Sequence, residues 1–186
     1  MKLKTLLLST ILLSSVTMAD NSAIKQEGVK YIKMLGGALK GELQPLMKAD
    51  KSGMSALEFC TVKANDITNE VNKKLPANVK VRRTAVKVRN SSQNQPDALD
   101  MKIMTEYISA IDEKTFTPKD IKVVEDADTT RVYKPLLAQG ACLKCHGTNI
   151  SKEISKSLEE NYPHDKAVNF KEGDLRGVIV AEIHKK

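Results

Sequence analysis

Apolar residues in the first part of the chain recur at the spacing of amphipathic helices. Between Ile24 and Leu46 most gaps between them are three or four residues, which predicts a helix that Pro45 ends. The polar residues 48–53 predict a loop. A second stripe predicts a helix that ends before Pro76, and its members are Leu57, Cys60, Ala64, Ile67 and Val71.

Beyond Pro76 the pattern alternates between strands and helices. Residues 79–82 alternate as a strand and residues 85–88 continue on the opposite phase, which predicts a β-bulge or a twist between them. Further strands are predicted at residues 121–124, 131–137 and 173–183, and helices at residues 97–111 and 150–158. Helices followed by strands with hairpin-like returns predict an α+β domain around an antiparallel sheet. A four-helix bundle is the alternative, and the strong final strand argues against it.

The five residues from Cys142 to His146 carry the most specific chemistry of the chain. Their pattern, C-x-x-C-H, is the attachment motif of a c-type haem. The thiols of Cys142 and Cys145 can form thioethers to the two vinyl groups of one porphyrin, and the His146 imidazole can then reach the iron. One covalently bound haem c is therefore the predicted cofactor. Ordinary all-helical cytochromes c carry this motif early, whereas about forty residues follow it here.

The beginning of the chain has the composition of a secretory signal peptide. Lys2 and Lys4 precede an apolar stretch, Leu6 to Val16, and Thr17-Met18-Ala19 resembles a cleavage site. We therefore predict a signal peptide over residues 1–19, cleavage after Ala19 and a periplasmic location. The alternative is an uncleaved membrane anchor, but the apolar stretch is short and is interrupted by Ser and Thr. No stable membrane span is expected after cleavage.

The length and net charge of the chain limit its possible domain organisation and partners. Residues 20–34 are predicted as a helical lead-in and residues 35–186 as a haem-binding domain with its own core. The formal net charge of +7 falls to +5 on removal of residues 1–19, because two lysines and no acids are lost (7 − 2 = 5). The positive charges are spread along the chain, which indicates a solvated surface with some steering of an acidic redox partner. Nucleic acid is not an expected partner, because the predicted export, the absence of tryptophan and the absence of a basic stripe argue against it.

The residue on the other side of the iron decides the chemistry, and several residue types can take this position. The candidates are Cys60, His164, His184 and the seven methionines, of which Met18 is in the predicted signal peptide and Met54, Met101 and Met104 lie in or beside predicted helices. The histidines have the alternative of being ordinary surface residues, and the methionines that of filling the core. Cys60 has no cysteine partner outside the haem motif, so it is a metal ligand, a buried apolar thiol or a thiol paired with another molecule.

Several motifs follow one another in a fixed order along the chain. They are Cys60-x-x-x-Ala64-x-x-Ile67, Arg82 to Asn90, Pro96-Asp97, Arg131-Val132-Tyr133-x-Pro135-Leu136, Cys142 to Gly147, Tyr162-Pro163-x-Asp165-x-Ala167 and Gly173 to Gly177. In this order and spacing the chain resembles a family of small exported haem c domains. That family was first catalogued as a domain of unknown function and characterised in a cyanobacterial protein. Related domains form the sensing part of some bacterial membrane histidine kinases.

The resemblance covers roughly Leu35 to the C-terminus. It implies a PAS-like fold and a six-coordinate haem c held by His146 and a distal cysteine thiolate, which on this chain is Cys60. A thiolate donates charge to the iron and lowers its reduction potential relative to a Met/His pair. The loop after Asn90 departs from the family, because Ser91-Ser92 stand where the family commonly has proline.

Arginines and glycines of these motifs have expected supporting roles. Arg83, Arg89 and Arg131 are predicted to pair with the haem propionates, because guanidinium groups bind carboxylates in a bidentate way. The alternative for each is an ordinary surface or sheet-edge arginine. Gly147 and Gly173 are expected to permit tight turns, and Gly177 a close backbone approach within the last strand.

Three functions are consistent with such a site. The first is a redox or diatomic-gas sensor module, in which reduction opens the position of Cys60 to a small gas. The second is a soluble periplasmic electron-transfer cytochrome. A peroxidase-like enzyme ranks last, because no distal His/Arg pair is evident and a thiolate would block the substrate position. The chain is therefore predicted not to be an enzyme, and an unidentified redox or signalling protein is its expected partner.

Overall fold

The computed structural model describes residues 16–117 and 119–185, with side chains from residue 22 onward. The predicted signal peptide lies outside these residues except for the first turn of α1. Helices come first, as α1 (Val16–Ala49), α2 (Met54–Val62) and α3 (Ala64–Lys73). None of the helices in the described ranges combines the length and the apolar character that a membrane crossing requires.

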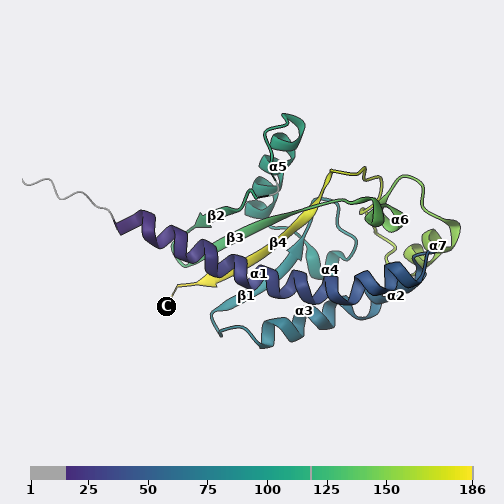
Figure 1. The fold of residues 1–186 in the computed structure, drawn as a ribbon, viewed down its shortest axis with the longest axis horizontal. Coiled ribbons are helices and arrows are strands. Elements are labelled where there is room, and N and C mark those ends of the chain that lie inside the picture. The colour runs from purple at the N-terminus through teal and green to yellow at the C-terminus, as the bar shows by residue number, and fades with distance from the viewer. Residues whose placement is uncertain (1–15, 118, 186) are drawn as a thin grey trace, which may run out of the picture.

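The strands form one antiparallel sheet in the order β1-β4-β3-β2 (Figure 1). Their bounds are β1 (Val79–Thr84), β2 (Lys122–Glu125), β3 (Thr129–Leu137) and β4 (Leu175–His184). The last strand lies in the interior of the sheet, and Ala181 is opposite Val81 on one side and Val132 on the other. The predicted α+β architecture, with N-terminal helices before an antiparallel sheet, is confirmed.

Helix α1 covers one face of this sheet. Its apolar residues Tyr31, Ile32, Leu35 and Leu39 join one buried cluster with Val81, Val132, Ile179 and Ala181 of the strands. Gly28 lies against the side chain of Val132, where a Cβ atom would collide with it. The expected boundary between residues 34 and 35 thus falls inside a continuous helix, and residues on both sides of it share one core.

Helix α5 (Ala98–Asp112) covers the opposite face. Ile103, Met104 and Tyr107 pack there against Tyr133, Val178 and Val180. Because helices cover both faces, β4 is buried along almost its whole length, as its continuous apolar run predicted.

Shorter elements lie toward the end of the sheet where β1 and β3 finish (Figure 1). They are α4 (Ser91–Asn94), the 3₁₀ turn η1 (Gly140–Cys142), α6 (Leu143–His146) and α7 (Lys152–Asn161). Helix α7 packs against α2 through Ile154, Leu158 and Leu57. This packing brings the second helix of the chain beside the segment that carries the C-x-x-C-H motif.

Three local predictions were wrong. Pro45 lies inside α1, because the loss of one backbone N–H near the exposed end of a long packed helix does not stop it before Ala49. The single stripe from Leu57 to Val71 belongs to two helices, which meet at Lys63. The strand does not continue past Thr84 through a bulge or a twist: the pairing of β1 with β4 stops there, and residues 85–90 form a loop.

Candidate functional site

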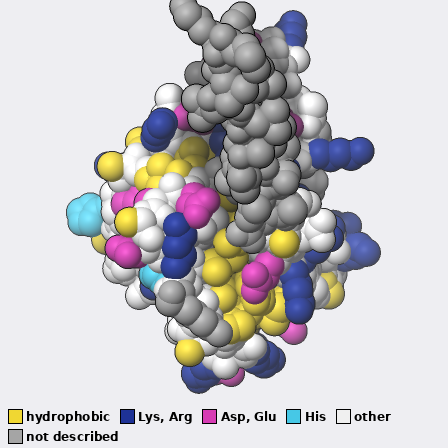
Figure 2. Space-filling view, turned by 90° about the vertical axis from the view of Figure 1, so that its left-hand side faces the viewer, with side chains coloured by type: hydrophobic (Ala, Val, Ile, Leu, Met, Phe, Trp, Pro, Cys, Tyr) yellow, Lys and Arg dark blue, Asp and Glu magenta, His cyan; other side chains and the backbone are white. Residues whose placement is uncertain are grey.

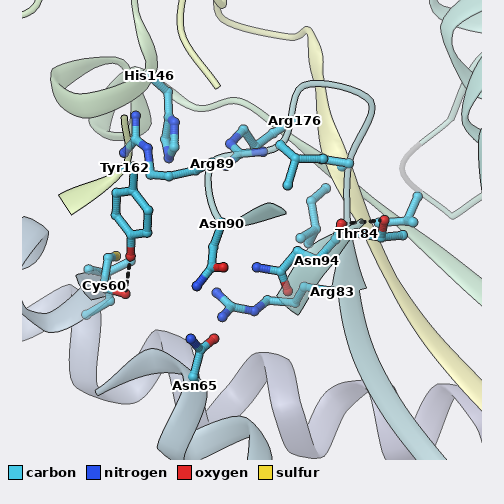
Figure 3. Close-up of a pocket in the computed structure, with 16 residues that line it drawn as sticks. Cys60, Asn65, Arg83, Thr84, Arg89, Asn90, Asn94, His146, Tyr162 and Arg176 are labelled. Atoms are coloured by element: carbon cyan, nitrogen blue, oxygen red, sulfur yellow. Dashed lines mark hydrogen bonds between the residues drawn. The ribbon is translucent and has the colours of Figure 1, made fainter. Parts of the chain in front are cut away.

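A pocket lies beyond the end of the sheet, where the short elements meet (Figure 3). Its volume is about 220 Å³. It is lined by Leu43, Cys60, Asn65, Arg83, Thr84, Ala85, Val88, Arg89, Asn90, Asn94, Leu136, His146, Tyr162, Arg176, Gly177 and Val178. The early helices, the β1 end, the loop after it, the C-x-x-C-H turn and β4 therefore all contribute to one site.

His146 ends the short helix α6 and points into this pocket. Its Nδ1 atom lies 2.7 Å from the carbonyl oxygen of Ala167, so Nδ1 carries the proton and donates it to that oxygen. The Nε2 lone pair is then free to bind a metal ion. Burial lowers the pKa of His146 well below its usual value, and the nearby charges of Arg176 and Arg89 add to this effect. The imidazole is neutral, as a metal ligand must be.

Cys142 and Cys145 are free, half-buried thiols on the turn that precedes His146. Burial raises the pKa of the Cys145 thiol, which packs beside Leu57 and Ile154. The turn closes at Gly147, where a Cβ atom would lie 2.5 Å from the Leu143 carbonyl oxygen. The expected need for glycine at this turn is thus confirmed by sterics.

Cys60 lies in the last turn of α2 and lines the same pocket as His146. Burial raises the pKa of its thiol, and the charges of Arg83, Arg89 and Arg176 oppose that rise. Its carbonyl oxygen accepts a hydrogen bond of 3.4 Å from the Tyr162 hydroxyl (Figure 3). Cys60 contributes the only sulfur atom among the residues that line the pocket.

The other candidate ligands lie elsewhere. His164 is exposed and lines a second, more polar pocket, and His184 is exposed at the end of β4, where it contacts Thr129. Met101 is exposed on α5, and Met104 is buried in the core on the α5 face of the sheet. Met54 packs with the α2–α7 cluster. Met1 and Met18 lie outside the residues whose side chains are described. Among the candidates within the described part of the chain, the structure brings only Cys60 to the pocket of His146.

Two arginines present unpaired charge to the pocket. Arg83 makes no ion pair among the described residues, and its Nε atom is buried without a hydrogen-bond partner. Arg176, on β4, likewise forms no ion pair within the described part of the chain, and burial lowers its pKa to about 10. Arg176 lies over the Phe170 ring, 5.3 Å from its centroid, but neither guanidinium has an anionic partner in the described ranges. Largely buried cations without an anionic partner are costly, so these side chains indicate a site for an anionic group. Arg176 was not among the predicted site residues, although its Gly-Asp-Leu-Arg-Gly motif stood out.

The two remaining predicted arginines are already bound by protein groups. Arg89 lines the pocket, but its Nε atom pairs with Asp165 at 2.9 Å and its Nη2 atom donates to the Cys145 carbonyl at 2.5 Å. Arg131 does not line the pocket. It lies on β3 and pairs with Asp97 at 2.5 Å, toward the start of α5. The structure therefore brings Arg83 and Arg89 to the site, and leaves Arg131 outside it.

The donor set fits a covalently attached haem. Two thiols and a neutral imidazole follow one another on a single turn. The imidazole shares its pocket with the Cys60 thiol, whereas Cys142 and Cys145 are not among the lining residues. Two guanidinium groups that form no ion pair in the described ranges are available for carboxylates. Apolar walls are supplied by Leu43, Val88, Leu136 and Val178.

Comparisons with known proteins agree with this architecture. The sequence model of the family described as Tll0287-like matches residues 9–183. The crystal structure of the cyanobacterial heme-protein Tll0287 superposes with a TM-score of 0.65 and 20% sequence identity, over 92% of this chain and 98% of that chain. No curated protein sequence matches the chain.

Proposed function

The chain belongs to the Tll0287-like family, and on this premise we propose that it is an exported c-type haem protein with one haem attached at Cys142 and Cys145. The observation that carries the proposal is the shared pocket of His146 and Cys60, which lie on segments far apart in the sequence. When bound, the haem supplies an iron centre that cycles between two oxidation states and that can take a small gas ligand. The solved cyanobacterial relative is a heme protein, which supports the same cofactor here.

His146 and Cys60 are the proposed axial ligands. The hydrogen bond from Nδ1 to Ala167 leaves the Nε2 lone pair of His146 available, and this geometry supports its role on the proximal side. Cys60 is favoured on the distal side because none of the candidate histidines and methionines in the described ranges lines the pocket. Coordination would also keep this thiol from oxidation in the periplasm, the proposed location.

Arg83 and Arg176 are the proposed partners of the haem propionates. Both line the pocket, and neither has an acidic partner in the described ranges. A carboxylate at each guanidinium would neutralise a buried charge and supply an acceptor for the Arg83 Nε atom. Arg89 is less suited to this role because protein carbonyl and carboxylate groups occupy its donors.

Redox or diatomic-gas sensing is the function we favour for this site. A thiolate stabilises the oxidised iron, so reduction is expected to weaken the hold of Cys60. Cys60 lies half-buried in the last turn of a short helix and packs against the core cluster rather than within it. Tyr162 is hydrogen-bonded to the Cys60 carbonyl and also lines the second pocket. This second pocket offers a small molecule a polar approach to the Cys60 side.

A soluble electron carrier is the alternative. Lys and Arg side chains are scattered over the face shown in Figure 2 rather than gathered in one patch, which is compatible with transient contacts to an acidic partner. An enzymatic role of the peroxidase type is not favoured, because a thiolate ligand would occupy the position that a peroxide needs.

Production in a host that matures c-type cytochromes tests this proposal. The exported chain is expected to lack residues 1–19, to gain the mass of one haem, and to keep its colour after acid–acetone extraction, because thioether bonds survive that treatment. Cys145→Ser is expected to lose one of the two attachment bonds. The matched control, Cys60→Ser, is expected to keep both bonds. A wild-type protein that is colourless and unmodified would refute the proposal.

The same protein separates the two functional readings. A sensor is expected to bind carbon monoxide after reduction, with loss of the thiolate bands, whereas a carrier is expected to keep both axial ligands and to refuse carbon monoxide.

A further inference from the structure

A short segment after the Tyr-Pro turn, residues 165–170, lies along the turn that carries His146. The Phe170 amide donates to the His146 carbonyl at 2.9 Å, and the Asn169 amide donates to the Gly147 carbonyl at 3.0 Å. The carbonyl oxygen of Ala167, a fully buried residue, is the acceptor of the His146 Nδ1 proton. The orientation of the imidazole therefore depends on where this segment holds one carbonyl group.

The ion pair between Arg89 and Asp165 holds that carbonyl. The Arg89 Nε atom lies 2.9 Å from Asp165, and each side chain is only 9% exposed. The Nη2 atom of Arg89 donates to the Cys145 carbonyl at 2.5 Å and to the Ala167 carbonyl at 3.3 Å. The Asp165 Oδ1 atom accepts the Ala167 amide at 2.7 Å. One buried ion pair thus binds the carbonyl group of Cys145, which precedes His146, and both the amide and the carbonyl group of Ala167.

We propose that Arg89 and Asp165 form a positioning unit that fixes the proton of His146 on Nδ1 and directs its Nε2 lone pair into the pocket. Arg89 sets the distance between the Cys145–His146 peptide and Ala167, and Asp165 sets the direction of the Ala167 peptide. A hydrogen bond held in this way also makes the imidazole a stronger donor to a metal ion. The importance of this unit for haem rests on the proposed function.

A role in stability alone would have a different signature. The sheet contains a comparable buried pair, Arg82 with Glu182, at 2.8 Å and with side chains 18% and 13% exposed. Neither of these two residues contacts the His146 turn or lines its pocket. Glu182→Gln is therefore a matched control, because it breaks a buried pair without touching the proposed unit.

The first measurement uses the full chain made without haem, with the ring nitrogens of His146 observed by ¹⁵N NMR. The wild type is expected to show one tautomer, with the proton on Nδ1. Asp165→Asn keeps the size of the side chain and an acceptor for the Ala167 amide, but removes the charge that holds Arg89. This variant and Arg89→Met are expected to show a mixture of the two tautomers, and Arg89→Lys is expected to recover part of the wild-type signal.

The second measurement uses the haem-loaded proteins. Asp165→Asn and Arg89→Met are expected to raise the reduction potential, because a less firmly bonded Nδ1 proton makes His146 a weaker donor. Glu182→Gln is expected to unfold more easily, with the tautomer and the potential of the wild type. If Arg89→Met does not fold, the isosteric Asp165→Asn decides the question.

Unchanged tautomer and unchanged potential in Asp165→Asn would overturn the proposed unit. Wild-type protein that takes up no haem would instead count against the proposed function, and the NMR result on the haem-free chain would still judge the role of the pair.

Discussion

At the scale of single residues, the site depends on backbones that approach one another closely. A Cβ atom at Gly177 would lie 2.5 Å from the Thr84 carbonyl oxygen and 3.0 Å from the Ala85 Cβ atom. Thr84, Ala85 and Gly177 all line the pocket, and Gly177 follows Arg176 directly. The glycine therefore permits the contact between the β1 end and β4 that places both unpaired arginines.

Gly177→Ala is expected to lower the free energy of unfolding by about 1–3 kcal/mol, because the two strands must separate to admit a methyl group. Urea unfolding measures this loss. Gly41→Ala in α1 is the control, since no atom lies within 4 Å of the position that a Cβ atom would take there. It is expected to be neutral or to stabilise by about 0.5–1 kcal/mol. Equal stability of Gly177→Ala and the wild type would show that the strands tolerate the methyl group.

Some residue-level assignments could be made from the sequence and others could not. Cys60 stood out because it is the one cysteine outside the C-x-x-C-H motif. The structure places it in the same pocket as His146. Arg83 and Arg131 could not be separated in advance, because both lie on strands rich in polar residues. Which arginine is paired depends on acids brought by other elements: Asp97 of the α5 N-terminus is beside Arg131, and no acid reaches Arg83 in the described ranges.

At the scale of elements, the start of α5 is fixed by a capping box. Asp97 accepts the Asp100 amide at 2.8 Å, and the Asp100 side chain accepts the Asp97 amide at 3.1 Å. Asp97 also pairs with Arg131, and the buried Asp100 pairs with Arg82. The helix that covers one sheet face is thus tied through its first turn to β1 and β3.

This arrangement predicts a loss of stability in acid. Burial alone would raise the pKa of Asp97, but the Asp100 amide and the Arg131 guanidinium outweigh it and hold that pKa below its usual value. A carboxyl group with a lowered pKa in the folded state stabilises the protein above about pH 4. That contribution is lost as the pH falls through the folded pKa.

Asp97→Asn keeps a helix cap but has no charge to lose. Its free energy of unfolding is therefore expected to vary less between about pH 5 and pH 3 than that of the wild type. Urea titrations at each pH measure this difference. Glu159→Gln, at an exposed residue of α7 with no ion pair among the described residues, is the control and should retain the wild-type pH dependence. Identical acid slopes for Asp97→Asn and the wild type would contradict this account of the α5 cap.

Element boundaries were less predictable than element types. Periodicity located the helices and strands because apolar spacing reflects which face is buried. It could not show that α2 and α3 are separate, since a stripe with gaps of three and four continues across the break at Lys63. It could not show that β1 stops at Thr84, because Val88 is buried although it lies in a loop. The Val88 carbonyl accepts a hydrogen bond from the Lys166 amide and not from a neighbouring strand.

At the scale of the whole molecule, helices on both faces leave one end of the sheet for the site (Figure 1). The α+β class followed from the order of patterns along the chain. The pocket did not, because its walls come from α1, α2, α3, β1, β3, β4 and the loops after them, and only their packing brings these together. Sequence motifs identified the C-x-x-C-H turn, and tertiary structure identified what faces it.

Low-temperature electron paramagnetic resonance of the oxidised, haem-loaded protein tests the central claim most directly. Iron held between His146 and the Cys60 thiolate is expected to give a low-spin signal of the thiolate type, and Cys60→Ala is expected to lose that signal. A thiolate-type signal that persists in Cys60→Ala would remove Cys60 from the site and contradict the account.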